Sequence, residues 1–151
     1  MAKNLKINPQ ELEAFRAALP ETERHEQFDW LRNTYDVVIA RFIIQQQSLA
    51  TKKVNVKAWA EAFGMSGPEN QDKLSFNILT GVSDEKALAD HINPTIPIII
   101  IEHVFKSGRK NQSTHIILDG NHRLRKAFLK GLPDIEAYYL PKELSKLTKL
   151  R

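Results

Sequence analysis

One segment of the chain places several reactive side chains on a single turn. Residues 116–127 read Ile-Ile-Leu-Asp-Gly-Asn-His-Arg-Leu-Arg-Lys-Ala, so an apolar strand should pass through Asp119 and Gly120 into a helix. The first N–H groups of a helix lack internal partners and carry partial positive charge, and a glycine lets a ligand approach the backbone. His122 and Arg123 add donors suited to phosphate oxygens. The segment therefore predicts a phosphate site.

Neighbouring residues extend and qualify this hypothesis. Asn121 offers an amide donor, and Arg125, three residues beyond His122, lies near enough to support the same helix face. Asp119 would repel a phosphate unless it holds a metal ion such as Mg²⁺ or acts as a base. Asp119 and His122 are therefore the candidate catalytic residues. The alternative is a capped helix start with solvated arginines, because Asp and Asn favour caps and short motifs recur by chance.

The composition narrows the chemistry that this segment can perform. The 151 residues include no cysteine, which excludes disulfide frameworks, thiolate metal sites and cysteine nucleophiles. The net charge of +4 tolerates nucleic acid or nucleotides as partners and requires neither. The longest apolar run, residues 98–101, is far shorter than the roughly 20 residues of a membrane helix. Residues 1–8 lack a secretory signal. We expect a cytoplasmic protein without membrane association.

Residues 74–140 alternate strand and helix signals. We expect strands at 74–79, 96–105, 115–118 and 135–140, helices at 83–92 and 121–130, and a short basic helix after Pro141. Residues 96–105 are mostly β-branched and apolar, which is typical of a strand covered on both faces. The polar turn at 106–112 should join this strand to the next as a hairpin. The order β-α-β-β-α-β predicts an α/β (α+β) core with a mixed sheet, spanning residues 74–151.

Residues 1–73 are expected to form a helical region packed on that core. Asn8 and Pro9 provide a helix cap and a first-turn proline, and Pro20 ends this helix. From residue 28 to 44 apolar residues recur at helical spacing, although the β-branched run 37–39 also permits a strand. A short helix is expected at 56–63, followed by a loop.

The segment at residues 119–123, Asp-Gly-Asn-His-Arg, resembles the ParB/sulfiredoxin-like superfamily. The ParB nuclease-like domain carries a Gly-Glu-Arg-Arg box at the equivalent turn. Gly120 matches its glycine and Arg123 its second arginine, and Arg125 and Ala127 match the Arg and Ala that follow. The resemblance covers about residues 76–140 and is more specific for the fold than for one reaction.

Two other branches of the superfamily share this turn. Sulfiredoxins carry Gly-Cys-His-Arg, and Asn121 stands where their reactive cysteine would be, so sulfinic-acid reduction by that route is excluded. Free-serine kinases carry Asp-Gly-His-His-Arg, from which this chain departs only at Asn121. What the resemblance implies is a turn that cradles the phosphates of ATP or CTP, often with Mg²⁺. It further implies an ATPase with nuclease-like activity, with DNA and a second copy of the chain as further expected partners.

Two other function classes remain open at this stage. A kinase acting on a free amino acid such as serine needs a second carboxylate, for which Glu26 and Glu102 are the candidates. A non-enzymatic accessory protein of plasmid or phage type would bind DNA or another protein. Lys106, Arg109 and Lys110 could then contact a phosphate backbone, although a basic hairpin tip is usually only solvated. The same two interpretations apply to the basic residues near the C-terminus, Lys142, Lys146, Lys149 and Arg151.

Overall fold

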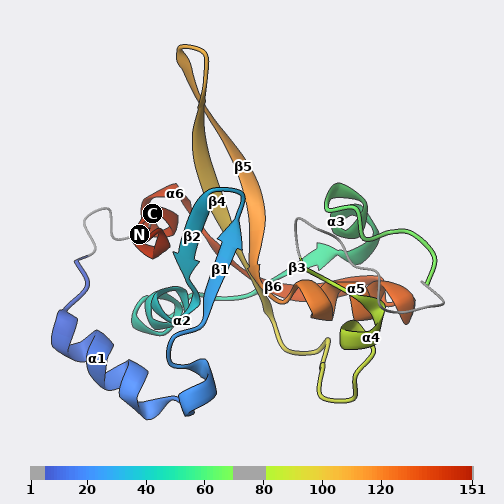
Figure 1. Cartoon of the computed structure of the whole chain (residues 1–151), viewed down its shortest axis with the longest axis horizontal. Coiled ribbons are helices and arrows are strands. Elements are labelled where there is room, and N and C mark those ends of the chain that lie inside the picture. The colour runs from blue at the N-terminus through green and yellow to red at the C-terminus, as the bar shows by residue number, and fades with distance from the viewer. Residues whose placement is uncertain (1–5, 70–80, 151) are drawn as a thin grey trace. The chain divides into compact units, whose positions relative to one another are not determined.

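The chain is a mixed α and β protein, as the sequence predicts. The computed structural model describes residues 6–69 and 81–150. The described strands are β1 (Gln27–Trp30), β2 (Asn33–Asp36), β3 (Lys52–Asn55), β4 (Ile98–Ser107), β5 (Lys110–Asp119) and β6 (Asp134–Leu140). The described helices are α1 (Pro9–Ala18), α2 (Val37–Gln46), α3 (Val56–Ala62), α4 (Asp84–Ala87), α5 (Asn121–Leu129) and α6 (Lys142–Ser145), with the 3₁₀ turns η1 (Glu21–Glu23) and η2 (Lys146–Thr148). They are labelled in Figure 1.

The strands form two sheets, and the chain divides into two compact units. One sheet pairs β1 with β2, and the other has the order β3-β6-β4-β5. Unit 1 comprises residues 1–49, 100–118 and 140–151, and unit 2 comprises residues 50–99 and 119–139. Both units are built from separated segments, so their boundaries differ from the expected division after residue 73. Whether residues 1–73 and 74–151 behave as separate domains stays a prediction.

Unit 1 is organised around α2, which α1, the β1-β2 hairpin and η2 contact. The helix α2 begins where the Asp36 carboxylate accepts hydrogen bonds from Val38 and Ile39 N–H. Phe15 of α1 packs edge-on against Phe42 of α2, with ring centroids 5.5 Å apart. The expected capping of α1 is confirmed, because the Asn8 side chain accepts from the amides of the first turn.

The expected single helix over residues 28–44 is wrong in its first half. Residues 27–36 form an antiparallel hairpin whose register pairs Gln27 with Asp36. Its connection places Leu31 at φ 56°, a conformation rare outside glycine and asparagine, so the sequence carries no turn signature there. The β-branched run 37–39 is helical because Asp36 caps it.

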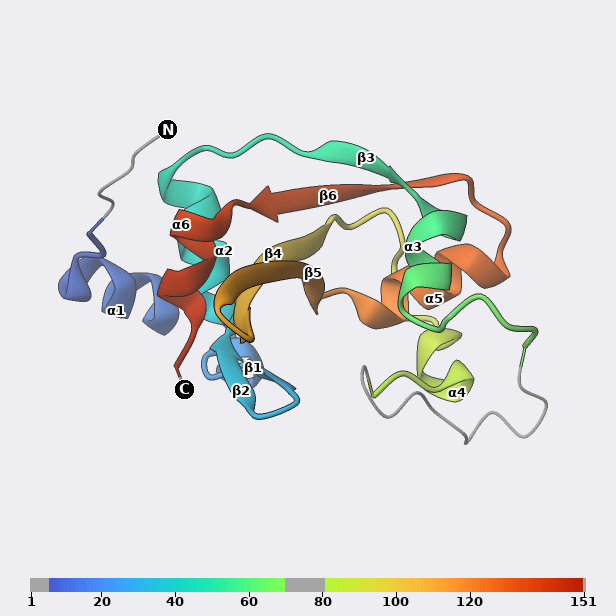
Figure 2. The same cartoon turned by 90° about the horizontal axis from the view of Figure 1, so that it is seen from above.

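Unit 2 sets α5 against α3 and α4, as Figure 2 shows for α3 and α5. The strand β3, which the sequence analysis missed, pairs antiparallel with β6 in a register that opposes Lys52 to Ala137. Asn55 caps α3 through the Ala58 N–H. The expected helix at 83–92 is shorter than predicted, since α4 ends at Ala87. The expected strand at 74–79 lies outside the described residues.

No described helix could cross a membrane. The longest, α1 and α2, have ten residues each, which corresponds to about 15 Å. That length is about half the thickness of the hydrocarbon core of a bilayer.

Candidate functional site

The predicted corner between β5 and α5 exists within unit 2, but a side chain fills the space beside its glycine. Gly120 is the N-cap of α5 and adopts φ 106°, which an L side chain rarely does. A Cβ placed there would lie 2.4 Å from Cγ2 of Ile98. Because Gly120 has no side chain, the side chain of Ile98 can pack against its backbone. We expected Gly120 to leave this backbone open to a ligand, but Ile98 occupies the space on the side where a Cβ would lie.

Arg123 is engaged by groups of unit 2 itself. Its Nη2 lies 3.0 Å from the Asp119 carboxylate, and its Nη1 donates to the carbonyl oxygens of Ile96 and Pro97. The side chains of Arg123 and Asp119 are only 12% and 18% exposed. These hydrogen bonds connect α5 to Ile96 and Pro97, which directly precede β4. Arg123 therefore has a structural role that could not be inferred from the sequence. A phosphate would have to compete with Asp119 for this guanidinium.

Arg125 is a structural residue, in contrast to its predicted supporting role at a phosphate. Its Nε and Nη2 donate to the Asp84 carboxylate at 2.6 and 2.9 Å. Its Nη1 donates to the carbonyls of Met65 and Gly67, and its Nη2 also donates to the carbonyl of Pro68. All five guanidinium N–H groups are thus used. Arg125 is 6% exposed, so it has neither a donor nor an open face to offer a ligand.

His122 differs from these arginines because its ring retains an unused nitrogen. Its Nε2 is buried and has no hydrogen-bond partner within residues 6–69 and 81–150. Burial lowers the pKa of His122, and the nearby charges of Lys86 and His91 lower it further. A neutral imidazole is therefore favoured at neutral pH. Asn121, the first residue of α5, is also buried.

Each carboxylate considered for catalysis lies close to a nitrogen of another side chain. Asp119 contacts Arg123, Glu26 lies 3.2 Å from the Arg41 guanidinium, and Glu102 lies 3.8 Å from Nε2 of His115. Among the described residues, no group of three or more His, Cys, Asp or Glu side chains could hold a metal ion. The Asp119 carboxylate is engaged by Arg123, and its expected role in holding Mg²⁺ stays a prediction.

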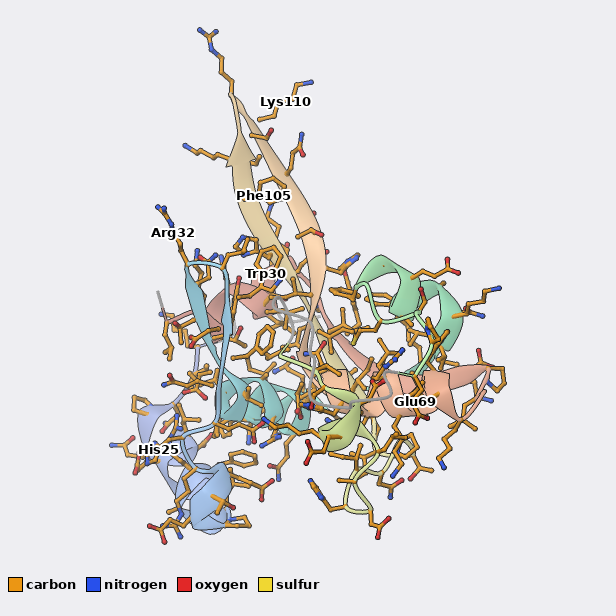
Figure 3. The ribbon with its side chains drawn as sticks, turned by 45° about the vertical axis from the view of Figure 1, so that its right-hand side comes forward. His25, Trp30, Arg32, Glu69, Phe105 and Lys110 are labelled. Atoms are coloured by element: carbon orange, nitrogen blue, oxygen red, sulfur yellow. The ribbon has the colours of Figure 1, made fainter. Side chains whose placement is uncertain are left out.

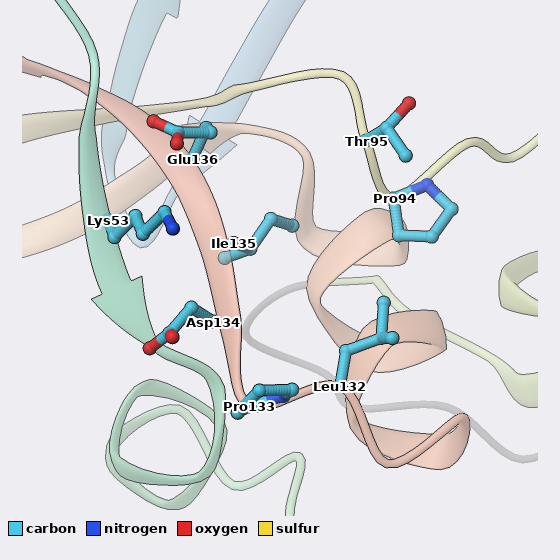
Figure 4. Close-up of a pocket in the computed structure, with 8 residues that line it drawn as sticks. All are labelled: Lys53, Pro94, Thr95, Leu132, Pro133, Asp134, Ile135 and Glu136. Carbon is cyan, nitrogen blue, oxygen red and sulfur yellow. The ribbon is translucent and has the colours of Figure 1, made fainter.

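Two cavities in the described part of the chain are lined by residues outside the motif. The larger, of about 350 Å³, belongs to unit 2 and is lined by Lys53, Pro94, Thr95, Leu132, Pro133, Asp134, Ile135 and Glu136, shown in Figure 4. It contains none of the residues predicted from the motif, and Lys53 opposes Glu136 across β3 and β6. The smaller, of about 130 Å³, belongs to unit 1 and has lysines at its edge. Neither cavity could be predicted from the sequence, because the residues that line each of them come from distant segments.

A basic arm in unit 1 is the other candidate for binding. The strands β4 and β5 continue past the rest of unit 1 as a two-stranded ribbon (Figure 1). Every residue from 105 to 113 is exposed, and a two-residue turn with Gly108 at φ 67° joins the strands. We call residues 105–113 the arm. Figure 3 shows Phe105 and Lys110 on it.

Comparison with known proteins adds no family to this geometry. No family model, curated protein or solved structure matches the chain. The resemblance to the ParB/sulfiredoxin-like superfamily therefore depends on the motif residues alone, chiefly Gly120, His122 and Arg123. It stays a prediction, as do the nucleotide, Mg²⁺ and DNA that it implies.

Proposed function

We propose that this chain is a DNA-binding protein that contacts duplex DNA through the arm. The observation that carries this proposal is the composition of a fully exposed ribbon. Residues 105–113 include three cations, Lys106, Arg109 and Lys110, and no carboxylate. The remaining positions include Asn111 and Gln112, whose amides can donate to and accept from base edges. This is the non-enzymatic function class that the sequence left open.

The exposure of the arm distinguishes it from an ordinary charged hairpin. Phe105, at the start of the arm, stacks on the His103 ring. The exposed positions that follow it bury little apolar surface, so the fold itself gains little from extending these strands. The cations of the arm have no carboxylate partner in the described part of the chain. The arginine ion pairs of unit 1 join Arg16 to Asp36 and Arg41 to Glu23 and Glu26. Unpaired cations on an extended ribbon favour a polyanionic partner.

The dimensions of the arm favour duplex DNA over duplex RNA. Neighbouring strands lie about 4.8 Å apart, so a two-stranded ribbon with its side chains fits the major groove of B-DNA, which is about 12 Å wide. The major groove of A-form RNA is too deep and narrow for side chains to read. Binding should be dominated by phosphate contacts, with dissociation constants of about 10⁻⁴–10⁻⁶ M.

Fluorescence anisotropy with a labelled duplex of mixed sequence tests this proposal. The full chain is titrated at several salt concentrations, and the slope of log K against log salt is measured. The variant R109Q/K110Q should lose two phosphate contacts, so the magnitude of the slope should fall by about 1.8, at about 0.9 per contact. Both positions are exposed, and the fold should be unaffected.

The matched control removes two cations from unit 2. Lys57 and Lys130 are exposed, so K57Q/K130Q changes the net charge as much as R109Q/K110Q does. The control should bind DNA with the affinity and salt slope of the unaltered chain. Equal losses in the two variants would show that binding follows net charge alone, and would contradict a role for the arm. Absence of binding by the unaltered chain at low salt would refute the proposal.

A second candidate function, binding of ATP or CTP at the corner between β5 and α5, is favoured by one observation. The buried Nε2 of His122 lacks a partner in the described residues, at the first turn of a nine-residue helix. A nucleotide phosphate there would take the place of Asp119 beside Arg123. Hydrolysis of the nucleotide and phosphorylation of a free amino acid such as serine both require this binding first, whereas nuclease activity would require a DNA phosphate at the same corner.

Calorimetry with ATP and with CTP, each with Mg²⁺, tests the second candidate. If phosphate competes with Asp119 for Arg123, the variant D119N should bind the nucleotide more tightly than the unaltered chain. The variant H122Q should bind it more weakly. An unaltered chain that gives no binding heat at millimolar nucleotide would contradict nucleotide binding, and with it nucleotide hydrolysis and the phosphorylation of a free amino acid.

A further inference from the structure

The smaller cavity belongs wholly to unit 1 and combines cations at its edge with buried polar groups in its wall. Its volume is about 130 Å³. Lys142, Lys146 and Lys149, from α6, η2 and the residue after η2, line it. Tyr35 and His103 also line it and are only 2% and 7% exposed. Strongly basic and deeply buried groups therefore meet at one small space.

The wall of the cavity is held in place by contacts that leave little freedom. The Tyr35 hydroxyl and Nδ1 of His103 are hydrogen-bonded. Trp30 packs edge-on against the His103 ring, with centroids 5.0 Å apart. Tyr35 also forms a β-bridge with Lys149, which fixes the backbone of that lysine beside the wall. The Ser145 hydroxyl donates to the Leu140 carbonyl and is already satisfied.

The charges around the cavity are unbalanced. None of its three lysines forms an ion pair in the part of the chain that the structure describes. Glu102 is the one carboxylate of the lining, and its Oε1 lies 3.8 Å from Nε2 of His115. The excess positive charge acts on His103: burial lowers the pKa of this imidazole, and Lys149 lowers it further. A bound anion would relieve this repulsion.

We propose that this cavity binds a single tetrahedral oxyanion, a phosphate group, through the ammonium groups of Lys142, Lys146 and Lys149. Its volume corresponds to roughly four water molecules at about 30 Å³ each, which is space for one phosphate and far below the 300–1,000 Å³ of pockets for larger organic ligands. Ammonium groups are donors only, so they suit an acceptor-only anion. The phosphate is either the free ion or the end of a phosphomonoester that extends into solvent.

This site is independent of DNA binding by the arm. Its lysines lie on α6, η2 and the following residue, and none belongs to residues 105–113. The variant R109Q/K110Q therefore serves as a control here, and its phosphate affinity should equal that of the unaltered chain. Loss of DNA binding with retained phosphate binding would separate the two proposals.

The test follows the imidazole signals of the full-length chain by NMR during titration with sodium phosphate, with sodium chloride at equal ionic strength as the reference. The His103 signal, assigned with the variant H103Q, should respond saturably, and the pKa of His103 should rise when phosphate is bound. The signal of His25, which does not line the cavity, should follow the chloride reference. A parallel titration with glycerol phosphate distinguishes the two sources. A saturable response to either compound supports the site, and a response to neither refutes it.

Two substitutions, one that removes a positive charge and one that removes a negative charge, provide the matched comparison. K149Q should weaken phosphate binding about tenfold, because one of three charge-assisted contacts is lost, and it should raise the pKa of His103 in the absence of phosphate. E102Q should tighten binding about threefold, because it removes the one opposing charge of the lining. Unchanged phosphate affinity in K149Q would overturn the proposal, as would weaker binding in E102Q.

Discussion

Substitution of Arg125 by Met gives the sharpest test of the roles assigned in unit 2. The side chain of Arg125 is 8% exposed and that of its partner Asp84 is 5% exposed, so the substitution leaves a buried carboxylate without its cation. Removing one partner of a buried ion pair typically costs about 3–5 kcal/mol. The carbonyls of Met65, Gly67 and Pro68 also lose a donor. We therefore expect a loss of about 4 kcal/mol in the free energy of unfolding.

Chemical and thermal denaturation measure this loss. For a chain of this size, about 4 kcal/mol corresponds to a fall in Tm of roughly 8–16 °C. The double variant D84N/R125M should recover part of the stability, since it removes the unpaired charge. The control R109M alters an exposed arginine of the arm and should change stability by no more than about 0.5 kcal/mol. A loss below about 1 kcal/mol in R125M would refute the structural role and reopen a role in ligand binding.

The backbone conformation of Gly120 and the shifted pKa values of His122 and Tyr35 lead to three further predictions. G120A should cost about 2–4 kcal/mol, because a Cβ would lie 2.4 Å from Ile98 Cγ2 at φ 106°; the control G131A, with φ 72° and nothing within 4 Å of its Cβ, should cost only about 1–2 kcal/mol in urea denaturation. The lowered pKa of His122 means that the unfolded chain binds the proton first, so stability should fall as pH drops below about 6.5; H122Q should flatten this dependence, and an unchanged slope would contradict it. Burial raises the pKa of Tyr35 to about 12, so stability should fall as pH rises above about 10, toward 12; the ionisation of Tyr35 near pH 12 should appear in an ultraviolet titration and disappear in Y35F.

The sequence predicted those helices, strands and turns that depend on interactions between residues close together in the chain. The cap at Asn8, the continuous burial at the start of β4 and the Gly120 turn into α5 all depend on neighbouring residues. The hairpin of β1 and β2 was missed because Leu31 adopts φ 56° without a glycine. The strand β3 was missed because only one of its four residues, Val54, is buried, so its alternation is weak.

The candidate site could be located from the sequence, but the partners of its side chains could not. The position of the corner follows from a strand, a glycine and a helix start in succession. The bonds of Arg125 reach Asp84, 41 residues away, and Met65, 60 residues away. Arg123 likewise meets Ile96 and Pro97 across 26 or more residues. Arginines at a helix start look alike in sequence whether a ligand or the protein itself accepts their hydrogen bonds.

The arm also bears on whether two copies of this chain could pair through the edges of their sheets. The strand β5 ends the order of its sheet, so its outer backbone groups could pair with a strand of another molecule. Arg109 lies in the turn and Lys110 begins β5. If the β5 edges of two molecules paired, these positive charges would repel one another, and the repulsion would oppose association into fibres. Neutralising both residues would remove that protection, so R109Q/K110Q should scatter more light than K57Q/K130Q at equal concentration.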